Sequence, residues 1–227
     1  MNFARHFSAF PALVLAAVSA VSVVSVVSVV ETVHADSPKV TSSATDAQPA
    51  VSTWSLDSAG SKISFVTVKA SDIAEVHTLS DLSGGVRFAG GRSGEVNLRI
   101  DLSSVETNIP IRNERIREFL FEVARFPTAS IHGHIAADDF LNLPVGDSTT
   151  SSLPFMLDLH GVQIPITAEV LALRVGKGRL LVTSTKPIII NAASVGLVAG
   201  IDKLQELASL PSISKAVPVS FVLNFVQ

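Results

Sequence analysis

The chain has 227 residues, a formal net charge of −3 at pH 7 and no cysteine. The near-neutral balance argues against a nucleic-acid-binding protein, which would carry a basic stripe. The lack of cysteine excludes disulfides, thiolate metal sites and lipid-modified cysteine. A chain of this length accommodates one domain with accessory segments, and it can bury enough apolar surface to fold without disulfides.

Residues 1–35 have the pattern of a secretory signal peptide. A weakly basic start precedes a long apolar stretch over residues 7–30, and Val33-His34-Ala35 gives the small-x-small pattern of a cleavage site. We therefore expect cleavage near Ala35 and export. The apolar stretch also approaches the length that spans a bilayer, so an uncleaved segment that anchors the protein in the inner membrane is the alternative. A first residue of Asp36 rather than Met1 would support release.

Residues 36–52 form a low-complexity stretch of Ser, Thr, Ala, Asp and Pro. Such a composition lacks the apolar content that folding requires, and it predicts a flexible linker. The folded domain is therefore expected over residues 53–227. Within it, no apolar run is long enough to predict another membrane span.

Most of the domain is predicted to be β-strand. Residues 62–69 are rich in β-branched and aromatic side chains, and four later segments alternate apolar with polar residues, as half-buried strands do. The four segments are residues 95–102, 130–136, 155–160 and 217–225. Their apolar faces, with that of the first strand, include Phe65, Leu98, Ile100, Leu157, Phe221, Leu223 and Phe225.

Glycine residues indicate where the chain turns between these strands. The turn signals are Gly84-Gly85, Gly90-Gly91, Gly146-Asp147 and Gly176-Lys177-Gly178. Many strands joined by short turns, with no alternation of strands and helices, predict an all-β protein with an antiparallel barrel or sandwich.

Two helices are expected to interrupt the strands. Residues 111–124 place Ile116, Phe119, Leu120 and Val123 on one apolar stripe, with Pro110 at the start. Residues 201–210 form a shorter candidate that ends before a proline.

Five blocks of sequence, in order, resemble the YceI-like family. They are Ser61–Phe65, Ile100–Thr107, Arg112–Arg117, Arg125–Ala129 and Leu157–Val162. The resemblance covers about Trp54 to the C-terminus, although Lys69 and Arg115 stand where many members have histidine. It implies an extended antiparallel β-barrel of lipocalin type, with about eight strands and one or two short helices around an elongated apolar cavity. It also implies a bacterial periplasmic or secreted protein that binds a polyisoprenoid or similar lipid.

The apolar faces of the strands supply the candidate ligand contacts. We predict that Phe65, Leu98, Ile100, Leu157, Phe221, Leu223 and Phe225 contact the lipid; the alternative is that they form an ordinary filled core. An isoprenoid tail buried against them would gain roughly 0.8 kcal/mol per CH₂.

Polar candidates lie on the first helix and at a turn. Arg112 and Arg115 could contact the phosphate of a prenyl pyrophosphate, or they could form surface pairs with glutamates of the same helix. Arg112 could also pair with Asp101, as their places in the family blocks suggest. His160 could orient a head group, or it could bond the turn backbone. The pair His132 and His134 has a spacing that some metal sites use, but an outward polar face accounts for it.

No catalytic signature is found among G-x-S-x-G, P-loop, Rossmann and H-E-x-x-H patterns. We therefore expect a protein that is not an enzyme, with no cofactor and no metal. Its expected partner is an isoprenoid or other long-chain lipid, held for transport, storage or sensing, and a transient contact with a membrane is compatible with that role. The alternative is a periplasmic interaction protein with a filled barrel and no ligand. The sequence does not indicate an oligomeric state.

Overall fold

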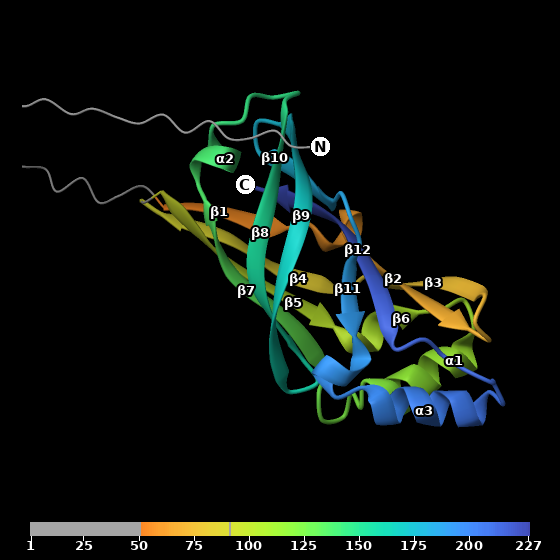
Figure 1. Cartoon of the computed structure of the whole chain (residues 1–227). Helices are drawn as coiled ribbons and strands as arrows, with labels where there is room; N and C mark the ends of the chain where they lie inside the picture. Colours follow the sequence, from red (N-terminus) through yellow and green to blue (C-terminus); the bar gives the residue numbers. More distant parts are fainter. Residues whose placement is uncertain (1–50, 91) are drawn as a thin grey trace, which may run out of the picture. The chain divides into compact units, whose positions relative to one another are not determined.

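The computed structural model describes residues 51–90 and 92–227 (Figure 1). The predicted signal peptide, its cleavage site and most of the predicted linker lie outside the described residues. The first strand, β1 (Val51–Leu56), begins two residues before the predicted start of the domain. In the described part of the chain, no helix has the length and apolar character that crossing a membrane requires.

Eight antiparallel strands close into a barrel, which confirms the predicted all-β class. In order around the ring they are β1, β4 (Leu82–Ala89), β5 (Ser93–Asp101), β7 (Thr128–Ala136), β8 (Ser148–Leu159), β9 (Val162–Gly176), β10 (Arg179–Ser184) and β12 (Ala216–Val226). The ring closes where β1 pairs with β12, with Ser55 opposite Val226 and Leu56 opposite Phe225. A barrel of eight strands is about wide enough to enclose one small ligand.

A second group of strands extends the barrel wall beyond this ring (Figure 1). The group comprises β2 (Lys62–Lys69), β3 (Ile73–Leu79), β6 (Val105–Glu106) and β11 (Ile188–Asn191). The long strand β12 joins the two parts, because its C-terminal half pairs with β1 and β10 while its N-terminal half pairs with β2 and β11. A 3₁₀ turn, η1 (Ser58–Gly60), separates β1 from β2.

Two helical segments lie together at the extended end of the barrel (Figure 1). The first is α1 (Pro110–Arg115), which continues as a π-helical turn η3 (Ile116–Leu120); the second is α3 (Val198–Leu207). They pack closely at Gly200, where an added Cβ would lie 2.5 Å from the Phe119 carbonyl oxygen. A third helix, α2 (Asp138–Leu141), which the sequence did not predict, lies before β8.

The predicted helix over residues 111–124 is confirmed up to Leu120 and wrong beyond it. The Phe121 N–H donates to the Ile116 carbonyl at 2.9 Å, a π-type bond, and Glu122 has a φ of +46°. A left-handed residue cannot continue a right-handed helix, so the helix ends there. The second helix begins three residues earlier than predicted and ends three residues earlier.

The turn signals are correct at three places and wrong at one. The chain turns at Gly90, at Gly146 and between β9 and β10, whereas Gly91 lies outside the described residues. Gly84 and Gly85 instead lie inside β4. A Cβ on Gly84 would lie 2.1 Å from the Asn97 carbonyl oxygen, so these glycines allow close approach of neighbouring strands rather than a turn.

Candidate ligand-binding cavity

A cavity of about 560 Å³ occupies the barrel interior. Every strand of the eight-stranded ring contributes inward-facing side chains, most of them apolar. Among the predicted ligand residues, those that line the cavity are Phe65, Leu98, Ile100, Arg112, Arg115, Leu157, Phe221, Leu223 and Phe225. The barrel is therefore hollow, which counts against the filled-barrel alternative.

His160 is the predicted ligand residue that does not line the cavity. It lies at the turn between β8 and β9 with a φ of +55°, and its ring packs on Phe126 with centroids 4.3 Å apart. Its Nε2 faces Glu122 Oε2 at 3.7 Å. The structure thus places His160 in the packing of a turn, apart from the other candidates.

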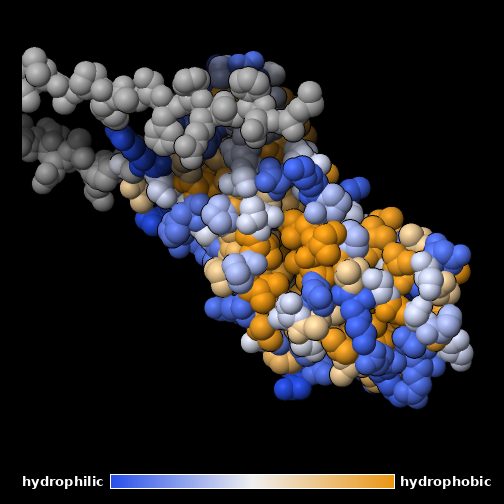
Figure 2. All heavy atoms as spheres, viewed as in Figure 1, coloured by the Kyte–Doolittle hydropathy of each residue, from blue (hydrophilic) through white to orange (hydrophobic). Residues whose placement is uncertain are grey.

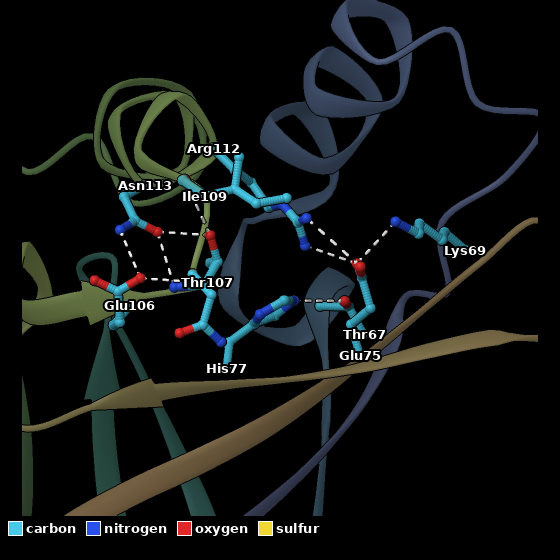
Figure 3. A network of polar contacts seen from close by, with 10 residues as sticks. Thr67, Lys69, Glu75, His77, Glu106, Thr107, Ile109, Arg112 and Asn113 are labelled. Carbon is cyan, nitrogen blue, oxygen red and sulfur yellow. Dashed lines mark hydrogen bonds and ion pairs between the residues drawn. The ribbon is translucent and has the colours of Figure 1, made fainter.

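A polar cluster lines the cavity at the α1 end (Figure 3). Glu75 Oε2 lies 2.9 Å from Lys69 Nζ and 2.7 Å from Arg112 Nη1, so one carboxylate joins β2, β3 and α1. The hydrogen bond from Lys69, with the charge and hydrogen bonds of Arg112, lowers the pKa of Glu75 despite its partial burial. The carboxylate therefore stays charged at neutral pH.

The contacts of Arg112 and Arg115 differ from the two intramolecular pairings that the sequence suggested, with Asp101 and with glutamates of the same helix. Arg112 pairs with Glu75 and not with Asp101, whose side chain accepts from the Ser103 N–H at 2.8 Å. Arg115 donates to the Leu207 carbonyl at 3.4 Å rather than to a glutamate of its own helix. The prediction of surface pairs on this helix is therefore wrong for both candidates, because α1 faces the cavity and α3.

His77 lies beside this cluster and is 2% exposed. Its Nε2 lies 2.9 Å from Thr67 Oγ1, and its ring meets Phe65 edge-on at 5.3 Å. Burial is the main cause that lowers the pKa of His77, and the positive charge of Arg112 adds to it. The histidine is consequently held neutral.

We expect the free energy of unfolding to fall as the pH drops through the titration of His77. The unfolded chain protonates His77 near the ordinary pKa of 6.5, whereas the folded protein does so only at a lower pH. Stability is therefore full above that value and decreases on acidification toward the lowered folded-state pKa, by at most about 1.4 kcal/mol per pH unit. Urea unfolding measured at several pH values between about 7 and 5 gives the free energy of unfolding as a function of pH. This free energy should fall less steeply on acidification for His77→Gln than for the wild-type protein. Equal slopes in the two proteins would contradict this assignment.

A buried asparagine fixes the turn that precedes α1 (Figure 3). Asn113 Oδ1 accepts from the Thr107 N–H at 2.9 Å and from the Thr107 hydroxyl at 2.6 Å, and Asn113 Nδ2 donates to Glu106 Oε1 at 3.0 Å. The bond from Asn113, followed by one from the Asn108 N–H, lowers the pKa of Glu106. This network holds Ile109 and the start of α1 in place.

A cation–π pair between β1 and β9 lies at the wall of the cavity. The Arg174 guanidinium lies over the Trp54 ring, 4.6 Å from its centroid. Trp54 lines the cavity and Arg174 does not, so the indole separates the charge from the apolar interior.

The side wall is thin between β9 and β11. In the described part of the chain these two strands share no hydrogen-bonded ladder, and a groove runs between them. Ile166, Ile188 and Ile190 line both the groove and the cavity, so apolar side chains alone separate them. Figure 2 shows apolar residues gathered on the outer face in this region.

The sequence did not single out Lys69, Glu75 and His77 as site residues. Alternation does place Ile73, Glu75, His77 and Leu79 on one face of β3, but two of the four are polar. An inward face that mixes polar and apolar groups gives no amphipathic signal, so only the tertiary structure identifies it.

Comparison with known proteins agrees with this geometry. Residues 54–225 match the YceI-like domain family. A structure described as a polyisoprenoid binding domain from Saccharophagus degradans implicated in plant cell wall breakdown is 39% identical, with a TM-score of 0.72 over 76% of this chain and 97% of that one. Burkholderia cenocepacia BcnA, 18% identical over 74% and 98% of the two chains, has the same fold with a TM-score of 0.58. No curated protein matches the chain. The protein belongs to the YceI-like family, whose members are generally binding proteins rather than catalysts.

Proposed function

We propose that this protein binds a polyisoprenoid lipid inside the barrel, for transport, storage or sensing. The observation that carries the proposal is the apolar cavity, whose volume of about 560 Å³ is within the range of ligand sites, roughly 300–1,000 Å³. Each methylene of the tail that leaves water contributes about 0.8 kcal/mol. The described binding of polyisoprenoid by the relative from Saccharophagus degradans supports this ligand class.

The charges that line the cavity favour a lipid with an anionic head group. Among the described lining residues, Lys69, Arg99, Arg112 and Arg115 are positive, and Glu75 is the one carboxylate. Glu75 is already paired with Lys69 and Arg112. The excess of positive charge at the α1 end suits a phosphate or pyrophosphate, which arginine binds through two parallel hydrogen bonds. The tail would then extend toward Trp54.

Native mass spectrometry tests the proposal directly. Protein purified without detergent should carry an added mass that corresponds to an isoprenoid lipid, and delipidated protein should take up a prenyl phosphate. A bare mass with no uptake would show that the cavity is not a site for this lipid and would favour the interaction protein.

A variant that lacks two arginine charges distinguishes recognition of the head group from binding of the tail. Arg112→Gln with Arg115→Gln should weaken binding of a prenyl phosphate at least tenfold, because one hydrogen bond to a charged group contributes about 1.5–3 kcal/mol net and about 1.4 kcal/mol corresponds to a factor of ten. Binding of the matching prenyl alcohol should change little. Arg125→Gln is the control, because Arg125 is exposed and pairs with Glu122 away from the cavity. An equal loss of affinity for the prenyl phosphate and the prenyl alcohol would exclude anion recognition by these arginines.

A further inference from the structure

We propose that the α1 end of the cavity docks on the surface of a lipid bilayer that carries anionic head groups. The inference rests on the proposed function, since it concerns how a lipid reaches the cavity. We define the mouth as the part of the lining formed by Lys69, Ile109, Ile111, Arg112, Arg115 and Ala208.

Exposure identifies the mouth as the place where the cavity meets solvent. Among the described apolar residues that line the cavity, only Ile109, Ile111 and Ala208 are exposed. Ile109 is 41% exposed and Ile111 is 53% exposed. The remaining apolar lining residues are buried or half-buried, so the cavity opens at the start of α1 and the end of α3.

Ion pairs and hydrogen bonds connect the elements around this opening. Glu75 joins Lys69 to Arg112, and Arg115 reaches the Leu207 carbonyl at the end of α3. The Ala70 N–H donates to the Ser212 carbonyl at 3.0 Å, which ties the β2–β3 hairpin to the segment after α3. The mouth is therefore a connected rim around the cavity.

The two isoleucines are held in their exposed positions. The Ile109 carbonyl accepts from the N–H groups of Arg112 and Asn113 at 2.9 and 3.1 Å. The buried side chain of Asn113 in turn binds Thr107, so the turn cannot easily fold Ile109 inward (Figure 3). Isolated exposed apolar residues are common on proteins, but a fixed pair beside the opening of an apolar cavity suits insertion at the head-group boundary.

The charge of the mouth is complementary to an anionic membrane. The mouth holds the three cations Lys69, Arg112 and Arg115, and the one carboxylate of the described cavity lining, Glu75, lies beside it and pairs with two of them. Glu114 on α1 and Asp72 at the hairpin tip do not line it. Long basic side chains can keep their apolar stems in the interface and place the charge among phosphates. Each basic residue near an anionic surface strengthens partition about fivefold, and a tail could then pass from bilayer to cavity without crossing water.

Flotation with vesicles tests the docking surface. Wild-type protein should float with vesicles of phosphatidylcholine and about one third phosphatidylglycerol, and far less with phosphatidylcholine alone. Ile109→Ser with Ile111→Ser should lower the partition about tenfold. The control is Val145→Ser with Val175→Ser, two residues that are 59% and 48% exposed and do not line the cavity. Circular dichroism would verify folding, and the single Ile111→Ser variant replaces the double one if that fails to fold.

Adding a prenyl phosphate from an ethanol solution to each variant tests lipid binding independently of membrane docking. If all variants take up a prenyl phosphate but wild-type protein does not float, or floats equally with both isoleucines replaced, the docking inference is overturned and lipid binding stands. If wild-type protein floats through the isoleucines but takes up no lipid, docking stands and the proposed ligand is wrong. A dimer in analytical ultracentrifugation that the isoleucine variant abolishes would assign this face to a second copy and overturn the inference.

Discussion

Leu98→Trp is expected to lower the affinity for a prenyl lipid at least tenfold while the barrel remains folded. Leu98 lies on β5, faces the cavity and is only half-buried, because part of its side chain borders empty space. An indole at this position would occupy room that the tail needs. Excluding two buried methylenes at about 0.8 kcal/mol each is already sufficient for a tenfold loss. The protein itself should lose little stability, since the larger side chain enters space rather than a packed core.

Glu95→Trp is the matched control for this substitution. Glu95 lies on the same strand, points to the opposite face and is exposed. A titration followed by native mass spectrometry, together with urea unfolding of both variants, gives affinity and stability. Unchanged lipid affinity in a folded Leu98→Trp protein would mean that the tail does not pass this part of the barrel.

Gly85→Ala is expected to destabilise the protein by more than about 3 kcal/mol, the range of large single-residue effects. A Cβ on Gly85 would lie 2.0 Å from the Trp54 carbonyl oxygen, a backbone atom that cannot move without displacing β1. Gly84→Ala should have a comparable effect, because its Cβ would meet the Asn97 carbonyl oxygen and its φ of +105° is unfavourable for alanine. Both glycines lie where the three strands β1, β4 and β5 come together.

Gly176→Ala serves as the control for the glycine substitutions. Its added Cβ would lie 3.6 Å from the Arg179 Cβ, an ordinary contact. We expect a change within about 0.5 kcal/mol in the same urea titration. A Gly85→Ala protein as stable as Gly176→Ala would show that β1 and β4 are farther apart than the structure places them.

These glycines also show what a local sequence pattern does not predict. A glycine pair indicates either a turn or a close approach of two backbones, and the neighbouring residues do not distinguish the two. Along β12, by contrast, Val217, Val219, Phe221, Leu223 and Phe225 alternate without interruption, and all five line the cavity as the pattern predicts. A strand with one apolar face is encoded locally, whereas the strand it lies against is not.

The first helix is a second place where the sequence pattern and the structure differ. Its apolar stripe continues at helical spacing to Val123, which predicts a longer helix than is present. The π-type bond at Phe121 and the left-handed Glu122 end it early, and Phe121, which was not on the predicted stripe, is buried instead. A propensity pattern does not register such a local change in hydrogen bonding.

For the candidate site, the apolar wall could be predicted and the polar end could not. Arg112 was identified, but its partner Glu75 lies 37 residues away on a strand whose inner face is mixed. The pair exists because the hairpin of β2 and β3 extends the barrel far enough to reach α1. Such a contact follows from the tertiary structure and leaves no pattern in either segment.

Because β12 pairs with β1, β10, β11 and β2, it determines when the barrel can close during folding. This strand follows all the others in the chain, and its pairing with β1 closes the ring by bringing Ser55 to Val226. Before β12 is synthesised, β1 and β10 have free edges and the apolar inner face is open to water, a state prone to aggregation. Pairing across so long a stretch of chain is also slow. Barrel closure must therefore follow translation of β12, and binding of the proposed lipid inside the closed barrel would come after it.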